Sequence, residues 1–255
     1  MELVFIAIPI YKQAPAASEM RSLDQCIKIL HAYPVIFIAP QSLDTQAYEE
    51  RCRDRVDFKI IRFADQYFEN IAGYNRLMLS PSFYKKFLNY KFMLVYQLDA
   101  WVFKDELRYW CIQGYDFIGA PHLPAENAEG EMQFLKNYAK FLEVISGIFK
   151  ITRKVKNVGN GGFSLRKVKT CYWMLRLLKS KVLRWGQNNE DVFFKYWGNL
   201  LYPLFKMPGD QTALLFSIEV LPEVSLKQIS PAIPFGCHAF EKYDKRNWQR
   251  VMEQH

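Results

Sequence analysis

Residues 91–103 read KFMLVYQLDAWVF. The stretch begins with an apolar and β-rich run that leads directly into Asp99. Its composition predicts a buried strand, because strands of parallel sheets that are covered on both faces carry nearly continuous apolar runs. In open α/β sheets, ligands collect at the carboxyl ends of the strands. Asp99 is therefore a candidate ligand contact, although an acid that follows a strand is often only a turn residue or a helix cap.

Three more apolar runs precede this strand, and polar segments with helical spacing separate them. The first helical segment begins with Ser18, a residue that can cap a helix. Further helices are expected at about residues 44–55 and 70–89. The order of strands and helices predicts an α/β fold with a mostly parallel central sheet. The earlier strands are expected at LVFIAIPIY (3–11), YPVIFIAP (33–40) and DFKIIRF (57–63).

The regular alternation ends downstream of the fourth strand. GYDFIGAPH (114–122) predicts one more short strand, and helices are expected at about residues 134–149 and 167–183. The glycine-rich stretch VGNGGFSLR (158–166) lies between these two helices. Its Gly161 and Gly162 can take backbone angles closed to other residues and let a ligand lie against the main chain. A glycine turn without a ligand is the open alternative, because such motifs are weak alone.

The stretch NNEDVFF (188–194) places two acids where a helix is expected to begin, with an asparagine available as its cap. Glu190 and Asp191 would complement the helix dipole in the first turn. A carboxylate held at a rigid helix N-terminus can also act as a general base that takes a proton from an attacking hydroxyl. Both interpretations stay open for these two residues.

Two of the four histidines are candidates for a site. His238 follows a turn bounded by proline and glycine, PFGCH (234–238). Together with Asp99 it could complete a site in which oxygen ligands and one imidazole hold Mg²⁺ or Mn²⁺ against a diphosphate. His122 follows the fifth strand and is a second candidate for lining the site, although most single histidines do no chemistry.

The net charge of +8 is concentrated in one part of the chain. Residues 134–186 hold thirteen Lys or Arg against one acid, Glu143, which predicts an anionic partner. Within this part, RKVKTCYWMLRLLKSKVLRWG (166–186) interleaves cations with Trp and Leu, a pattern that suits a helix lying on an anionic membrane. A helix that packs its apolar side into the core and turns its lysines to water is the alternative.

The cysteine pattern and the apolar runs indicate a cytoplasmic protein. The five cysteines are odd in number and scattered, without a C-x-x-C pair, so we expect reduced, buried thiols rather than disulfides or a zinc site. The first apolar run follows an acid and is interrupted by Pro9 and Tyr11, unlike a signal peptide. No run reaches the roughly 18 uncharged apolar residues of a membrane span. A peripheral position on the inner face of the membrane is compatible with this.

Six segments together resemble the GT-A glycosyltransferases, which use nucleotide-sugar donors. More narrowly, they resemble an uncharacterised bacterial family assigned as glycosyltransferases and met mostly in surface-polysaccharide contexts. The resemblance covers about residues 90–240. It implies a single GT-A-like, Rossmann-like domain, with a nucleotide-sugar half at about 1–122 and an acceptor half with the catalytic helix at about 123–255. The segments are QLDAWVF, YDFIGAPH, VGNGGFSLR, NEDVFF, ALLFSIE and FGCHAF.

The resemblance also implies roles for single residues. Asp191 falls on the aspartate that is the general base of inverting members, and Glu190 beside it is expected to hydrogen-bond a sugar. Asp99 falls on the position that contacts the metal or the ribose and diphosphate of the donor, and His238 falls on that of a histidine that often binds the metal, Mn²⁺ or Mg²⁺. Arg166 is a candidate for neutralising the diphosphate, with a solvated loop charge as the alternative.

One element of the family pattern is missing. Where a second aspartate belongs, one alignment puts Gln97 and the other puts Trp101, so an inactive scaffold stays open as an alternative. The resemblance implies donor contacts from Pro9, Tyr11, Gln97, Asp99, Ala100, Gly161, Gly162 and Arg166.

The sequence thus predicts a glycosyltransferase of the hexosyltransferase type. It would move a sugar from a nucleotide donor, taken to be a UDP-sugar, to a hydroxyl of a glycan or lipid-linked acceptor, with inversion, in bacterial surface polysaccharide or lipopolysaccharide synthesis. A nucleotidyltransferase is disfavoured because residues 8–17 lack a glycine-rich phosphate loop. A basic nucleic-acid-binding protein without enzymatic activity is disfavoured because the folds that bind single strands are mostly antiparallel. Nucleic acid is therefore not expected as a partner.

Overall fold

The computed structural model describes residues 1–122, 140, 144, 147–148, 155–185 and 189–254. The helix expected at about residues 134–149 lies almost entirely outside these residues. All five cysteines are free and buried, as the sequence predicted. Among the described residues, no helix combines the length and the apolar character that crossing a membrane requires.

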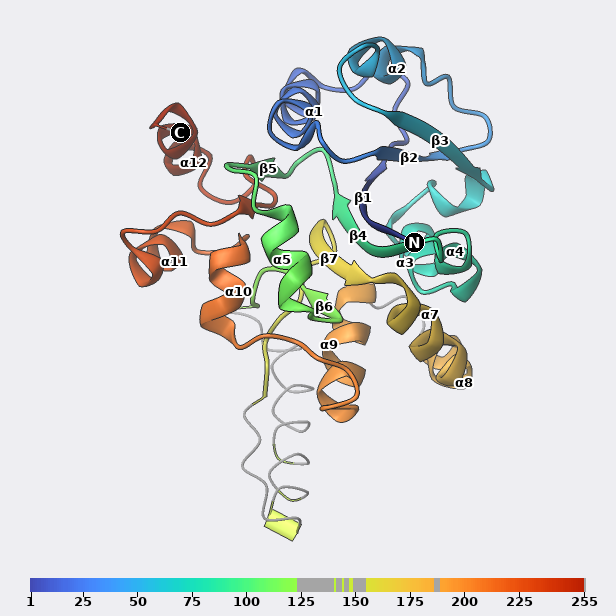
Figure 1. The fold of residues 1–255 in the computed structure, drawn as a ribbon, viewed down its shortest axis with the longest axis vertical. Coiled ribbons are helices and arrows are strands. Elements are labelled where there is room, and N and C mark those ends of the chain that lie inside the picture. Colours follow the sequence, from blue (N-terminus) through green and yellow to red (C-terminus); the bar gives the residue numbers. More distant parts are fainter. Residues whose placement is uncertain (123–139, 141–143, 145–146, 149–154, 186–188, 255) are drawn as a thin grey trace.

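A central sheet organises the described part of the chain, with its strands in the order β3, β2, β1, β4, β7 and β6 (Figure 1). The first four are parallel to one another, whereas β7 runs antiparallel to both β4 and β6. The predicted α/β class with a mostly parallel sheet is therefore confirmed. The strands are β1 (Glu2–Pro9), β2 (Val35–Pro40), β3 (Phe58–Phe63), β4 (Tyr90–Tyr96), β6 (Phe117–Ile118) and β7 (Phe163–Lys167).

Helices cover both faces of this sheet. Along β1, Val4 and Ile6 pack with residues of α1 and α5, while Phe5 and Ala7 pack with residues of α3, α4, α7 and α9. Burial on both faces explains why the sequence of the strands is apolar without alternation. The helices are α1 (Ala17–Leu30), α2 (Gln46–Cys52), α3 (Ile71–Met78), α4 (Pro81–Lys85), α5 (Leu107–Gln113), α7 (Val168–Leu177), α8 (Lys179–Trp185), α9 (Glu190–Leu200), α10 (Asp210–Phe216), α11 (Pro222–Ile229) and α12 (Lys245–Gln254), with a 3-10 turn η1 at Asp65–Tyr67.

The run at residues 91–103 is not one strand, contrary to the prediction. β4 ends at Tyr96, where the backbone N–H of Gln97 donates to Gly162 O at 2.8 Å. A turn follows, closed by the Ala100 N–H donating to Gln97 O at 2.9 Å. The chain then enters a small second sheet in the order β5 (Trp101–Val102), β9 (Gly236–Cys237) and β8 (Ser217–Ile218). Asp99 therefore lies in a turn between two sheets.

Three helix predictions need correction. Ser18 is not the cap of α1, because the helix begins at Ala17 and the Glu19 carboxylate accepts the N–H of Ala16 at 2.7 Å. The helix expected at about residues 70–89 divides into α3 and α4, with Pro81 in the first turn of α4, where its missing N–H costs nothing. The helix expected at about residues 167–183 divides at Leu178 into α7 and α8.

Candidate functional site

Asp99 meets His238 at the carboxyl edge of the parallel strands. The Asp99 carboxylate is half exposed, and its Oδ1 lies 3.1 Å from Nε2 of His238. Gln97 Oε1 lies 3.2 Å from the same nitrogen. His238 directly follows β9, so the second sheet brings the imidazole to the end of β4. Two predicted site residues that are far apart in the sequence thus come together here.

His238 is also held on its other nitrogen. Oε1 of Glu219, which follows β8, lies 3.1 Å from Nδ1 of His238. Burial lowers the pKa of His238, but the hydrogen bonds to Asp99 and Glu219 outweigh it and raise the pKa to about 9. The ring is therefore held between two carboxylates. Sequence reasoning did not single out Glu219, although it ends the segment ALLFSIE.

The glycines of the loop at residues 159–162 make room for side chains of the protein itself. A Cβ at each of three positions would overlap a neighbouring side chain that belongs to the site. The loop was expected to let a ligand lie against its backbone. In the structure, its glycines also leave space for three side chains of the site. The pairs are Gly159 with His122, Gly161 with Glu190, and Gly162 with His238.

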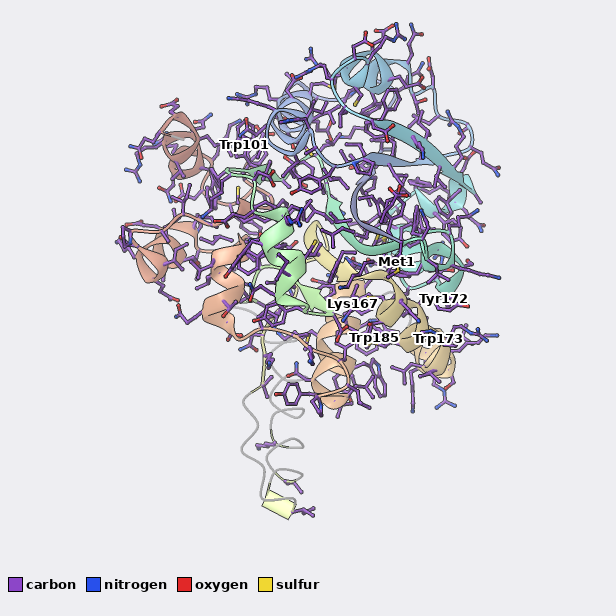
Figure 2. The ribbon with its side chains drawn as sticks, viewed as in Figure 1. Met1, Trp101, Lys167, Tyr172, Trp173 and Trp185 are labelled. Carbon is purple, nitrogen blue, oxygen red and sulfur yellow. The ribbon has the colours of Figure 1, made fainter. Side chains whose placement is uncertain are left out.

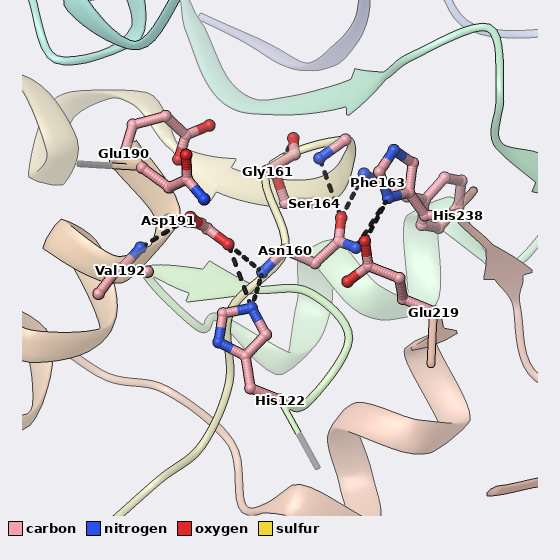
Figure 3. Close-up of polar contacts among 12 residues, drawn as sticks. His122, Asn160, Gly161, Phe163, Ser164, Glu190, Asp191, Val192, Glu219 and His238 are labelled. Carbon is pink, nitrogen blue, oxygen red and sulfur yellow. Dashed lines mark hydrogen bonds and ion pairs between the residues drawn. The ribbon is translucent and has the colours of Figure 1, made fainter. Parts of the chain in front are cut away.

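Asn160 links the two halves of the site (Figure 3). Its left-handed backbone, with φ of 68°, lets its side-chain oxygen accept the N–H groups of Gly162 and Phe163 at 2.9 and 3.0 Å. Its own N–H donates to Oδ2 of Asp191 at 2.9 Å, and its amide nitrogen lies 2.9 Å from Nδ1 of His238. One buried asparagine therefore sets the spacing between Asp191 and His238.

Asp191 is buried in the first turn of α9 and is held by several donors. Oδ2 also lies 3.2 Å from Nε2 of His122, and Oδ1 accepts the N–H of Val192 at 2.8 Å. Burial raises the pKa of Asp191, but His122 and the backbone N–H groups outweigh it and hold the pKa below its usual value. Asn189 precedes the helix, yet its side chain does not cap it. Asp191 is thus a fixed, ionised carboxylate at neutral pH.

Arg166 is fully buried on β7 and forms an ion pair with Glu190, with 2.8 Å between Nη2 and Oε1. It does not line the cavity, so the structure supports neither the predicted donor contact nor the alternative of a solvated charge. Its guanidinium instead holds the loop and α9 in place. Its other neighbours are Ser164 Oγ at 3.0 Å, the Tyr84 hydroxyl at 3.0 Å, Gly161 O at 3.3 Å, and the rings of Phe117 and Phe194 at 5.2 and 5.4 Å.

Glu190 presents one oxygen without a partner. Oε1 is paired with Arg166, whereas Oε2 is buried and meets no hydrogen-bond partner among the described residues. Burial raises the pKa of Glu190 above its usual value, against the opposing effect of Arg166. The buried hydroxyl of Tyr74 also makes no well-formed hydrogen bond within the described part, although the Gln97 side chain lies near it. Both residues line the cavity, and an unsatisfied buried polar atom is costly.

A cavity of about 770 Å³ collects most of the predicted site. Ala100 is buried and does not line it, and neither does His122, which contacts Asp191 from behind. The predicted residues that line it are Pro9, Tyr11, Gln97, Asp99, Gly161, Gly162, Glu190, Asp191 and His238. Lining residues that the sequence did not single out include Lys12, Tyr74, Asn160, Glu219 and Lys242.

The donor atoms around His238 Nε2 fit a divalent cation. No three His, Cys, Asp or Glu side chains of the described residues are arranged to hold a metal ion by themselves. The Gln97 carboxamide, however, adds a third donor beside Asp99 and His238, and its separation of 3.2 Å matches the roughly 3 Å between adjacent ligands of an octahedral ion. Glu219 on the other ring nitrogen supplies the carboxylate that commonly orients a metal-binding imidazole.

A family model described as "Protein of unknown function (DUF5672)" matches residues 57–238, well over half of the chain. This range includes every cavity residue from β3 to His238. By sequence, no curated protein matches the chain.

Solved structures with a similar fold are glycosyltransferases of low sequence identity. Mouse xyloside xylosyltransferase 1, in its apo form, has a TM-score of 0.56 and 11% identity, over 92% of this chain and 97% of that chain. The apo WbbM bifunctional glycosyltransferase has a TM-score of 0.49 and 12% identity, over 93% of this chain and 45% of that chain. Core-mannan synthase A from Aspergillus fumigatus, in an Mn/GDP form, has a TM-score of 0.43 and 10% identity, over 82% of this chain and 68% of that chain. The predicted GT-A fold is confirmed.

Proposed function

The chain belongs to the DUF5672 family, and we propose that it is a glycosyltransferase that moves a sugar from a nucleotide-sugar donor to a hydroxyl of a glycan or lipid-linked acceptor. One observation carries this proposal. Asn160 contacts both the ionised carboxylate of Asp191 and the imidazole of the Asp99–His238 pair, and these groups line one cavity. Sugar transfer needs a base and a diphosphate site that are held close together in this way. The GT-A fold supports the same conclusion.

Asp191 would act as the general base. The acceptor hydroxyl oxygen attacks the anomeric carbon of the donor, and its proton passes to Asp191 as the new C–O bond forms. The bond between that carbon and the diphosphate oxygen breaks, and the nucleoside diphosphate leaves with the electron pair. The low pKa of Asp191 keeps the carboxylate unprotonated before this step. Such a direct displacement inverts the anomeric centre.

The leaving diphosphate gains negative charge that the site must stabilise. Gln97, Asp99 and His238 would hold Mn²⁺ or Mg²⁺, and a bound ion supplies positive charge to the diphosphate oxygens. The chain's own cations Lys12 and Lys242 line the same cavity and add to this charge. Gln97 would thus take the place of the missing second aspartate, and in this proposal the chain is an active enzyme rather than an inactive scaffold.

The transferred sugar would be recognised by the two unsatisfied groups of the cavity wall. Glu190 Oε2 can accept a hydrogen bond from a sugar hydroxyl, and the Tyr74 hydroxyl can donate or accept one. A hexose offers several hydroxyls to such groups. A UDP-sugar is the donor we propose, in line with the class of enzyme.

We also propose a biological setting. Five free, buried cysteines suit a reducing compartment, which supports a cytoplasmic site of action. A role in bacterial surface polysaccharide or lipopolysaccharide synthesis, with a hexose as the sugar, follows only from the resemblance of the sequence motifs.

The experiment that tests the proposal is a thermal-shift screen of nucleoside diphosphates and nucleotide sugars, each with and without Mn²⁺. A ligand that binds only the folded chain raises its melting temperature, by an amount that grows with concentration. We expect at least one diphosphate to raise it, with a larger rise when Mn²⁺ is present. Nucleosides without phosphate serve as the control. If no diphosphate or nucleotide sugar changes the melting temperature, the proposal is wrong.

A further inference from the structure

The helices α7 and α8 expose large apolar side chains that the core does not use. Trp173 is 46% exposed, Leu177 is 80% exposed and Leu183 is 75% exposed. The inward side of α7, which includes Cys171 and Leu175, packs on the sheet, so the fold is complete without the exposed three. Trp173 and Leu177 lie one turn apart on the same side of α7. Figure 1 shows α7 and α8 together at one edge of the molecule.

Only positive charges surround these apolar side chains along the two helices. No Asp or Glu occurs between Lys167 and Trp185. The Arg176 guanidinium lies over the Tyr172 and Trp173 rings, at 5.6 and 5.1 Å from their centroids. Figure 2 shows Tyr172 and Trp173 at the edge of the molecule that α7 and α8 form. The exposed cations are Lys169, Arg176, Lys179, Lys181 and Arg184.

This combination selects one kind of partner. Cations alone would suit any polyanion, but Leu177 and Leu183 gain nothing from a sugar-phosphate backbone. Apolar side chains alone would suit a protein, but a protein partner would need a matching acidic rim. An anionic bilayer offers both environments, because phosphates meet the cations and the acyl boundary accepts Trp and Leu.

We propose that the exposed face of α7 and α8 docks the chain on an anionic lipid bilayer. This face is connected to the cavity, since the Trp185 indole N–H donates to Asn189 O at 3.2 Å and Asn189 lines the cavity. Docking would therefore hold the cavity near molecules anchored in the lipid. The proposal concerns the surface alone and stands or falls independently of sugar transfer.

Vesicle flotation tests the proposal with the full chain. Phosphatidylcholine vesicles are compared with vesicles that contain roughly a third phosphatidylglycerol, at low and at high salt. We expect flotation with the anionic vesicles only, and weaker flotation at high salt. Flotation with neither vesicle, or equal flotation with both, would overturn the proposal.

Substitutions separate the apolar contribution from the charge. The triple variant Trp173→Ala, Leu177→Ala and Leu183→Ala should lower vesicle affinity by about tenfold or more, because inserted apolar area drives interfacial binding. The matched control is Ile112→Ala, which removes an equally exposed apolar side chain from α5 and should bind as the unaltered chain does. Unchanged melting temperatures show that the variants are folded. Wild-type vesicle binding by the triple variant would contradict the proposal.

A second variant addresses the cations. Replacing Lys169, Lys179 and Lys181 by Gln should lower the affinity for anionic vesicles by several-fold for each charge. The control replaces Lys28, an exposed lysine on α1. A single-stranded oligonucleotide is the competitor. If it binds more tightly than the vesicles and the apolar triple variant retains that binding, the face belongs to nucleic acid and the proposal is wrong.

Discussion

Charged residues on the two sides of the glycine loop are used in opposite ways. On one side, Arg166 and Glu190 have side chains that are 0% and 3% exposed and bind mainly each other. On the other side, the Asp99 carboxylate is 50% exposed and meets His238 at the cavity wall. The first pair is buried, so loss of one partner leaves a buried charge. The second pair keeps access to solvent, so its loss should cost ligand binding rather than stability.

The largest expected effect is on the buried side. Arg166→Met should lower the free energy of unfolding by about 3–5 kcal/mol, because it leaves the Glu190 carboxylate buried without its partner. Urea denaturation measures this loss. The free energy of unfolding of Arg166→Lys should lie between those of the unaltered chain and Arg166→Met, because lysine keeps the positive charge but lacks the planar guanidinium. A loss below about 1 kcal/mol in Arg166→Met would remove the distinction between the two sides.

The loop itself should respond to a single methyl group. Gly162→Ala places a Cβ on the His238 imidazole and should displace the ring from Asp99. We expect donor affinity to fall by about 10–100-fold, the range found when a metal ligand loses its support. Isothermal titration with Mn²⁺ and the donor checks this. Gly209→Ala is the control, because no heavy atom lies near its Cβ. Equal donor affinity in both variants would contradict the account of the loop.

Loss of the half-exposed Asp99 carboxylate should affect donor binding more than stability, the opposite of the effect expected for Arg166. Asp99→Asn should lower the free energy of unfolding by less than Arg166→Met does, since the Asp99 side chain is half exposed and the Arg166 side chain is buried. It should weaken binding of the donor by about tenfold, because a charged ligand of the cation is lost. The two quantities are measured on the same preparation. If Asp99→Asn destabilises the fold but binds the donor normally, Asp99 serves stability and not ligand binding.

The smallest expected effect comes from His122, which contacts the proposed base Asp191. Burial raises the pKa of Asp191, and His122 is the largest influence that lowers it. His122→Gln should therefore raise the pKa of Asp191. Because the base must be unprotonated, the acidic limb of the rate profile should move to higher pH, with a loss of several-fold near neutral pH. An unmoved acidic limb would mean that Asp191 is not the titrating base.

The parallel half of the sheet could be predicted from sequence because its cause is local. Strands buried on both faces need continuous apolar residues, and β1, β2 and β4 have them. The division between β4 and β5 could not be predicted, because the alternation of Gln97 and Asp99 with Leu98 and Ala100 also fits a continuing strand. It depends on Gly162 O accepting the N–H of Gln97, a contact between segments far apart in the sequence.

The site shows the same division between local and distant causes. Residue type and position at element ends were enough to predict Asp99, Asp191 and His238, which all line one cavity. The burial of Arg166 was missed, because it depends on Tyr84 and Glu190, which come from two other segments. Asn160 was quoted in the glycine motif but its linking role was missed, since an asparagine among glycines equally indicates a plain turn.

The most direct test of the account is a comparison of donor binding with turnover in Asp191→Asn. Once a donor is identified, release of the nucleoside diphosphate measures transfer and the thermal shift measures binding. Asn keeps the size of the side chain, so donor binding should survive while the rate falls by about 10²–10⁴-fold, the usual contribution of a general base. A variant that binds the donor and turns over at nearly the normal rate would show that Asp191 does not take the proton.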